Sequence, residues 1–253
     1  MGFDVAADAY DRFMGQYSGP LAGEFLRLAG VRSGHRALDV GCGPGALTAR
    51  LVSLLGAGGV AAVDPSPPFV AAARDRLPGV DIRRGAAERL PFADSVFDAT
   101  LAQLVIHFLA DPVAGLREMS RVTRSGGVVA ACVWDHAGGK GPLATFWEAV
   151  QSIDDRAPTE ALLPGIAEGQ LADLFDTAGL LEIEQGSASV RVEFESFAAW
   201  WEPFTLGVGP AGDHVRRLGV RGRDELRHAC AGLLPAAPFG IDATAWTVRA
   251  RPR

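Results

Sequence analysis

The segment ALDVGCGPGALTARL, residues 37–51, constrains the fold more than any other part of the chain. An apolar run ends at Val40, glycines follow at Gly41, Gly43 and Gly45, and an apolar pattern of helical period comes next. Glycine lets a backbone turn sharply and approach a ligand closely. A glycine-rich turn that joins a strand to a helix indicates an α/β fold with a nucleotide-like ligand at the turn.

The residues around this turn alternate between strand and helix patterns. In chain order the segments are HRALDV, ALTARLVSLLG, GVAAVD, PFVAAARDRL and VDIRRG, which read as β-α-β-α-β. The segments FDATLAQLVI, DPVAGLREMSRVT and VVAACVW extend the series to residue 136. Repeated βαβ units predict a parallel, doubly wound sheet.

Beyond residue 136 the pattern changes to helical and loop-rich segments. Residues 180–194 and 240–250 alternate apolar with polar residues, as half-buried antiparallel strands do. We expect the helical material between these two segments to lie over the carboxyl edge of the sheet. The sequence shows no internal repeat.

Composition narrows the classes of partner and compartment. The formal net charge of −6 and the lack of a dense basic block argue against a nucleic-acid substrate and favour a small molecule. Cys42, Cys132 and Cys230 are widely spaced and lack metal-ligand spacing, which favours reduced thiols and a cytoplasmic protein without a bound metal. We expect neither a signal peptide nor a membrane span, because no long uncharged apolar stretch occurs.

Two carboxylates accompany the turn and bear on which ligand binds there. Gly41, Gly43 and Ala46 satisfy a dinucleotide fingerprint, so the glycine spacing leaves NAD and S-adenosylmethionine both open. Asp39, just before the turn, disfavours a pyrophosphate and suits the cationic adenosylmethionine. Asp64 lies about 20 residues beyond the turn, where a carboxylate accepts hydrogen bonds from ribose hydroxyls. The alternatives are structural: a helix N-cap for Asp64 and a stabilised turn for Asp39.

Several further motifs occur in a fixed order along the first half of the chain. They are AYDRF, LDVGCGPG, VDPS, GAAERLPFADSVFD, AQLVIHFLADP and an R-V-x-R-x-G-G turn before VVAACVW. Together they resemble the class I S-adenosylmethionine-dependent methyltransferases, in particular the ubiquinone and menaquinone biosynthesis methyltransferase group (methyltransferase type 11), over roughly residues 5–136.

This resemblance implies a fold and a division of the chain. The expected fold is an α/β, Rossmann-like, doubly wound and mostly parallel seven-stranded sheet, with an antiparallel last strand and a helical cap insertion. The expected domains are N-terminal lid helices in residues 1–30, a cofactor-binding core in residues 31–136, and cap insertions with the last two strands in residues 137–253.

The resemblance also assigns roles in binding adenosylmethionine. The residues expected at its methionine end are Asp39, Gly41, Cys42, Gly43 and Gln103. Those expected at the ribose and adenine are Asp64, Pro65, Ser66, Ala86, Ala87 and Glu88. The family usually has an acidic residue where this chain has Ala86, so the backbone N–H of Ala87 and the side chain of Glu88 are expected to substitute. The residues expected to close over the cofactor are Tyr10, Met14 and Tyr17, with Phe13 beside them; their helical spacing also suits plain packing.

The methyl acceptor is expected at the same edge of the sheet. His107 follows the fourth strand and is the candidate general base, with a structural hydrogen bond as the alternative. The candidate acceptor-pocket residues are Trp134, Trp147, Trp200 and Trp201, which could instead form the small core of the cap. The predicted function is methyl transfer to a small apolar or aromatic molecule. Two alternatives stay open: a nicotinamide-dependent oxidoreductase, and a non-catalytic adenosylmethionine-binding protein.

Overall fold

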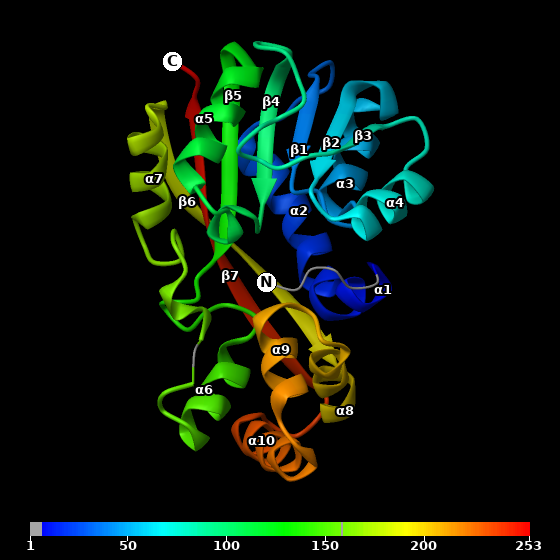
Figure 1. Ribbon diagram of the computed structural model, residues 1–253, viewed down its shortest axis with the longest axis vertical. Helices are drawn as coiled ribbons and strands as arrows, with labels where there is room; N and C mark the ends of the chain where they lie inside the picture. The colour runs from blue at the N-terminus through cyan, green and yellow to red at the C-terminus, as the bar shows by residue number, and fades with distance from the viewer. Residues whose placement is uncertain (1–6, 158) are drawn as a thin grey trace.

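One mixed sheet forms the centre of the molecule. The computed structural model describes residues 7–157 and 159–253, and their strands are β1 (Ala37–Val40), β2 (Val60–Asp64), β3 (Asp81–Arg84), β4 (Phe97–Gln103), β5 (Thr123–Trp134), β6 (Leu181–Phe194) and β7 (Phe239–Arg251). Their order is β3-β2-β1-β4-β5-β7-β6 (Figure 1). β1 to β5 pair in parallel, and β7 pairs antiparallel with both β5 and β6. The predicted seven-stranded sheet with an antiparallel last strand is confirmed.

Helices cover both faces of this sheet. The helices of the core are α2 (Gln16–Ala29), α3 (Ala46–Leu55), α4 (Pro67–Arg76), α5 (Pro112–Val122) and α7 (Gln170–Ala178). Successive strand residues face opposite sides, so Ala37 packs in the cluster of α2 and α3 while Leu38 packs in the cluster of α5 and α7. Both side chains are fully buried, as are most residues of β1, β2 and β4. This burial on both faces is what near-continuous apolar strands of a parallel sheet require.

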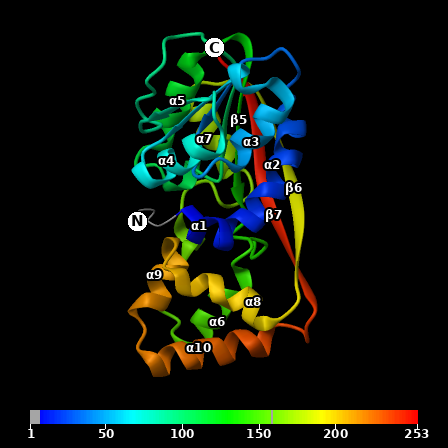
Figure 2. The same cartoon turned by 90° about the vertical axis from the view of Figure 1, so that its right-hand side faces the viewer.

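A helical cap lies beyond the carboxyl ends of β4 and β5 (Figures 1 and 2). Its elements are α6 (Ala144–Ile153), η4 (Glu160–Leu162), α8 (Phe197–Trp201), η5 (Glu202–Leu206), α9 (Gly209–Arg217) and α10 (Val220–Leu233). β6 and β7 continue past the sheet as a two-stranded ribbon that reaches this cap (Figure 2). The cap has an aromatic core, in which the rings of Phe146 and Phe204 stack at 4.5 Å. The predicted helical cap is therefore confirmed.

The N-terminal helical segment lies between the core and the cap (Figures 1 and 2). It consists of α1 (Ala7–Tyr10) and the π-helical η1 (Asp11–Gly15), and it leads into α2 of the core. Arg76 of α4 pairs with Asp11 at 2.5 Å, and Arg12 pairs with Glu202 of the cap at 2.7 Å. The segment is thus fixed to both parts, and the division of the chain at residues 30 and 136 stays a prediction.

Helix length and polarity bear on a membrane location. In the part of the chain that the structure describes, every helix is too short or too polar to cross a lipid bilayer.

Candidate active site

The glycine turn after β1 has the backbone geometry that its sequence predicts. Gly41, Gly43 and Gly45 adopt positive φ angles of 70°, 54° and 103°, which side chains with a Cβ rarely take. A Cβ at Gly41 would also collide with the side chain of Val105. Glycine at position 41 therefore lets the end of β1 approach the segment that follows β4.

The N–H groups of this turn are already used inside the protein. The amides of Gly41 and Cys42 both donate to the carbonyl of Val63, at 2.8 and 3.0 Å. The amide of Gly43 donates to Asp64 Oδ2 at 2.9 Å, and the amide of Gly45 donates to the Cys42 carbonyl. The turn is held closed by β2 and does not present free N–H groups from these four residues.

Asp64 lies at the end of β2 and joins two backbone segments. Its Oδ2 accepts from Gly43, and its Oδ1 accepts from the amide of Ser66 at 2.8 Å. Ser66, not Asp64, is the N-cap residue of α4. Burial raises the pKa of the Asp64 carboxyl, and the two amide hydrogen bonds oppose this shift. Asp64 therefore has a structural role, and each of its oxygens keeps a further lone pair for a ligand.

A cavity of about 270 Å³ opens beside the turn, and we call it the turn cavity. Ten of the predicted cofactor residues line it, namely Tyr10, Gly41, Gly43, Asp64, Pro65, Ser66, Ala86, Ala87, Glu88 and Gln103. The lining residues that sequence reasoning missed are Phe69, Gly85, Leu104, Val105, Phe108, Leu109 and Ala110. The apolar run directly after β4 was the available signal for most of the missed residues, because strand ends of a parallel sheet meet at one edge.

Four predicted cofactor residues lie outside this lining. Asp39 is 1% exposed, and its Oδ2 accepts from the Thr48 hydroxyl at 2.6 Å. Burial raises the pKa of Asp39 to about 7 despite that hydrogen bond. Cys42 is buried against the strands, Met14 lines a second cavity, and Tyr17 lines a small hollow in the cap region.

Two polar side chains fix the walls of the turn cavity. Gln103 Nε2 donates to the carbonyl of Ser18 at 3.0 Å, which ties the end of β4 to α2. Glu88 Oε1 accepts from the amide of Ala110 at 3.1 Å. Both side chains are thus held in place, and the buried Oε1 of Gln103 has no hydrogen-bond partner among the described residues.

A second, narrower cavity of about 30 Å³ adjoins the turn cavity, and we call it the histidine cavity. Tyr10, Leu104 and Phe108 line both cavities. The remaining lining residues are Phe13, Met14, His107, Trp134, His136, Leu143, Glu160, Val208, Gly209 and Pro210. The core, the N-terminal segment and the cap therefore all contribute to the walls of the histidine cavity.

His107 lies in η3 (Ile106–Phe108) at the wall of the histidine cavity. His107 does not follow Gln103 by a turn of α-helix, because β4 ends at Gln103 and Leu104 takes a positive φ of 62° before η3 begins. Its ring centroid is 6.0 Å from that of His136, and its buried Nδ1 has no partner among the described residues. Burial lowers the pKa of His107 well below 6.5 and that of His136 to about 4. Both imidazoles are neutral at physiological pH.

The four predicted acceptor tryptophans occupy different places. Trp134 lines the histidine cavity, and its buried Nε1 has no partner among the described residues. Trp200 lines the small hollow of the cap region. Trp147 donates its Nε1 hydrogen to Glu160, and Trp201 stacks on Phe197. The structure thus brings one of the four beside His107.

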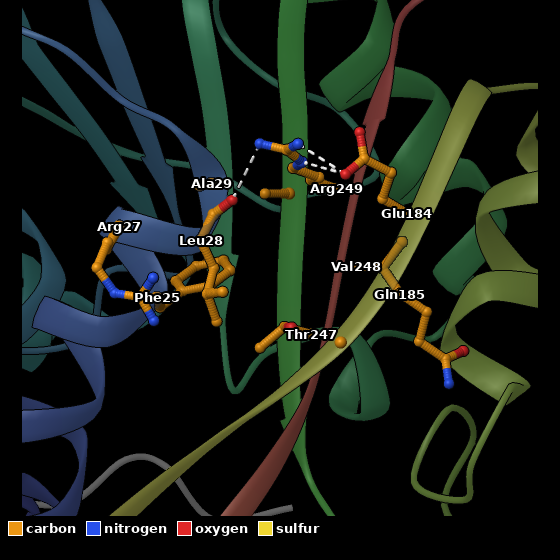
Figure 3. Close-up of a pocket in the computed structure, with 11 residues that line it drawn as sticks. Phe25, Arg27, Leu28, Ala29, Glu184, Gln185, Thr247, Val248 and Arg249 are labelled. Atoms are coloured by element: carbon orange, nitrogen blue, oxygen red, sulfur yellow. Dashed lines mark hydrogen bonds and ion pairs between the residues drawn. The ribbon is translucent and has the colours of Figure 1, made fainter.

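A further cavity of about 280 Å³ lies between α2 and the β6-β7 pair, as Figure 3 shows. Its charged groups already have partners. Arg249 contacts Glu184 Oε2 at 2.6 Å, and its Nη1 donates to the carbonyl of Leu28 at 3.4 Å (Figure 3). This cavity is not lined by any residue of the glycine turn, and we do not assign it a role in the site.

Comparison with known proteins gives the family of the core. Residues 38–131 match the family model described as a methyltransferase domain. A demethylmenaquinone methyltransferase of Beutenbergia cavernae is 41% identical over 102 residues, which are 40% of this chain and 42% of that protein. A malonyl-[acyl-carrier protein] O-methyltransferase of Serratia marcescens is 32% identical over 168 residues, which are 63% of each chain. The chain spans about half the length of the curated relatives it matches.

A solved structure supports the fold over most of the chain. The YcgJ protein of Bacillus subtilis superposes with a TM-score of 0.59 at 18% identity, covering 92% of this chain and 97% of that one. That likeness concerns the fold, and the sequence match identifies the domain. Residues 38–131 of this chain therefore form a methyltransferase domain of the class I, S-adenosylmethionine-dependent family.

Proposed function

We propose that this protein transfers a methyl group from S-adenosylmethionine to a small, apolar or aromatic acceptor. The cofactor would occupy the turn cavity and the acceptor would occupy the histidine cavity. The two cavities share Tyr10, Leu104 and Phe108 as a common wall, so ligands in them would be direct neighbours. The aromatic lining of the second cavity suits an apolar molecule.

The observation that carries this proposal is the way the glycine turn uses its own N–H groups. A dinucleotide needs such groups for its pyrophosphate. Here the amide of Gly43 is taken by Asp64, and those of Gly41 and Cys42 are taken by Val63. Asp39, buried directly before the turn, adds negative charge that disfavours a pyrophosphate and suits the ammonium and sulfonium of adenosylmethionine. The turn therefore favours adenosylmethionine over NAD, which disfavours the oxidoreductase alternative.

The residues of the turn cavity fit the parts of this cofactor. Asp64 would accept hydrogen bonds from the ribose hydroxyls, and Pro65, Ser66 and Ala87 would flank the adenine. Tyr10 would close the cavity, with its ring held edge-on to Phe69 at a centroid distance of 5.2 Å. Gln103 would lie near the methionine end.

Catalysis would depend mainly on alignment in a dry site. The bound cofactor supplies the methyl group, and the protein holds the acceptor atom in line with it and excludes water. We propose His107 as the general base, since it is neutral and its Nδ1 is free to take a proton from an acceptor that must lose one.

Transfer of a labelled methyl group tests the proposal. The protein is incubated with methyl-labelled adenosylmethionine and a small-molecule extract of bacterial cells, and labelled products are separated by chromatography. We expect label in a product of low molecular mass. Cofactor binding without any transfer would support the non-catalytic alternative instead.

A further inference from the structure

A buried carboxyl from the cap reaches the histidine cavity, and no sequence pattern singles it out. Glu160 opens the short helix η4 in the loop-rich part of the chain, and the residue is 4% exposed. It is the one acidic residue among the described residues that line this cavity. His107, His136 and Trp134 line the same space from the ends of β4 and β5.

One hydrogen bond fixes this carboxyl. Trp147 of α6 donates its Nε1 hydrogen to Glu160 Oε2 at 2.8 Å. The indole is itself 8% exposed and packs edge-on against Phe146, at a centroid distance of 5.0 Å. Because an ionised carboxylate can accept about four hydrogen bonds, most of its capacity is left over.

The negative charge of Glu160 lacks a protein cation. In residues 7–157 and 159–253 no Lys or Arg forms an ion pair with it, and none lines the histidine cavity. Burial raises the pKa of this carboxyl to about 7. Removing an unpaired carboxylate from water costs several kcal/mol, so a buried one in a cavity indicates a ligand that compensates it.

The rest of the cavity favours a cation as that ligand. The rings of Tyr10, Phe13, Phe108 and Trp134 line it, and the faces of aromatic rings attract cations. The neutral imidazoles of His107 and His136 add no positive charge to repel one. The cavity is narrow, with a volume of about 30 Å³, which suits an amine on a short chain better than one on a bulky body.

We propose that Glu160 determines acceptor specificity, and that it selects small molecules whose apolar body carries a protonated amine. This inference rests on the proposed function, because it takes the histidine cavity as the place where the acceptor lies. The role of Glu160 is recognition, and Trp147 positions its carboxyl.

The test compares three probes of nearly equal size on protein saturated with S-adenosylhomocysteine. Propylamine, 1-propanol and propionate are titrated and followed by calorimetry. We expect propylamine to bind at least about tenfold more tightly than 1-propanol, as hydrogen bonds to a charged group predict. Glu160→Gln keeps an acceptor for Trp147 and should abolish this preference. Glu148→Gln, which removes an exposed carboxylate of α6, serves as the matched control and should retain it.

A pH series adds a readout that a merely structural role would not change. Binding of propylamine should tighten between pH 6 and pH 8, because Glu160 ionises in that range while the amine stays protonated. The two histidines and the tyrosine that line the cavity do not titrate in that range. Asp39 does, but it lies outside the cavity, and the same series on Glu160→Gln separates its contribution from that of Glu160. Burial keeps the pKa values of His107 and His136 below the range and that of Tyr10 above it, and His214, beyond Trp147, also has a lowered pKa.

Three outcomes would overturn the inference. They are equal affinity for the amine and the alcohol, undetectable binding of propylamine, and a preference that survives Glu160→Gln, with or without a lower melting temperature. If S-adenosylhomocysteine binds normally, such a result rejects the role of Glu160 alone. If S-adenosylhomocysteine does not bind at all, the proposed function fails and this inference fails with it.

Discussion

Two buried carboxyls, one in the core and one in the cap, show how differently the two halves of the site are built. Asp39 and Glu160 each have a pKa raised to about 7 by burial, and each accepts a hydrogen bond from a protein side chain. Asp39 receives its bond from Thr48, nine residues away on the helix that follows its strand. Glu160 receives its bond from Trp147 in a separate helix and faces a cavity lined by three parts of the chain.

The core half of the site is therefore built by local contacts, and the cap half is built by tertiary packing. Asp39 is placed on the α3 face of the sheet simply because residues 37 and 39 alternate with residue 38 along β1. No comparable period places Glu160. Mutations in the core should therefore change cofactor binding through the geometry of the turn, and mutations in the cap should change acceptor binding.

The largest effect should come from Gly41→Ala, which disrupts the glycine turn in the core half of the site. A Cβ there collides with Val105 and the residue keeps a positive φ, so we expect a loss of about 2–5 kcal/mol in unfolding free energy from overpacking and backbone strain. Urea denaturation measures the loss. Gly43→Ala is the matched control, because its Cβ meets open space and adds strain alone. Equal losses for both variants would contradict the packing account.

His107→Gln tests the wall shared by core and cap. We expect turnover to fall by roughly 10²-fold while cofactor affinity stays nearly unchanged, as for loss of a general base that acts on the acceptor. Because the pKa of His107 is lowered, wild-type turnover should be flat from pH 6 to pH 8 and fall only in more acidic buffer. Steady-state kinetics with an identified acceptor measures both. Wild-type turnover in the variant would make His107 a structural residue.

Asp64→Ala separates the ligand-binding role of this core carboxylate from its structural role. Cofactor binding should weaken by about 1.5–3 kcal/mol, the usual cost of hydrogen bonds lost from a charged group. The melting temperature should fall as well, since the variant leaves the amides of Gly43 and Ser66 without their acceptor. Calorimetry and thermal unfolding separate the two effects. A lower melting temperature with unchanged affinity would show that Asp64 is structural only.

The smallest effect compares Asp39→Asn with Glu160→Gln as a function of pH. Between about pH 4 and pH 7 the unfolded chain has released these protons while the folded protein retains them, so each carboxyl makes wild-type stability fall as pH rises. Each variant lacks one such group. Its unfolding free energy relative to that of wild type should therefore increase by about 1–2 kcal/mol between pH 5 and pH 8. Urea denaturation at both pH values measures this gain. A gain in neither variant would contradict the raised pKa values.

The sequence predicts the core half of the site better than the cap half. The mostly parallel, doubly wound sheet and ten residues that line the turn cavity were predicted from the glycine turn, the alternating elements and the ordered motifs. Asp39 was expected to face the ligand, but its strand register turns it toward Thr48. Trp147 and Trp201 were candidates for the acceptor pocket, and they pack within the cap because aromatic side chains also form its core. Glu160 was missed because it belongs to no periodic segment.

The central claim is that the glycine turn binds adenosylmethionine and not a dinucleotide. Calorimetric titration of the purified protein with adenosylmethionine, S-adenosylhomocysteine and NAD tests it most directly. We predict dissociation constants on the order of micromolar for the first two and no measurable binding of NAD, because the N–H groups of the turn that a pyrophosphate needs are occupied. Binding of NAD as tight as that of adenosylmethionine would contradict the account.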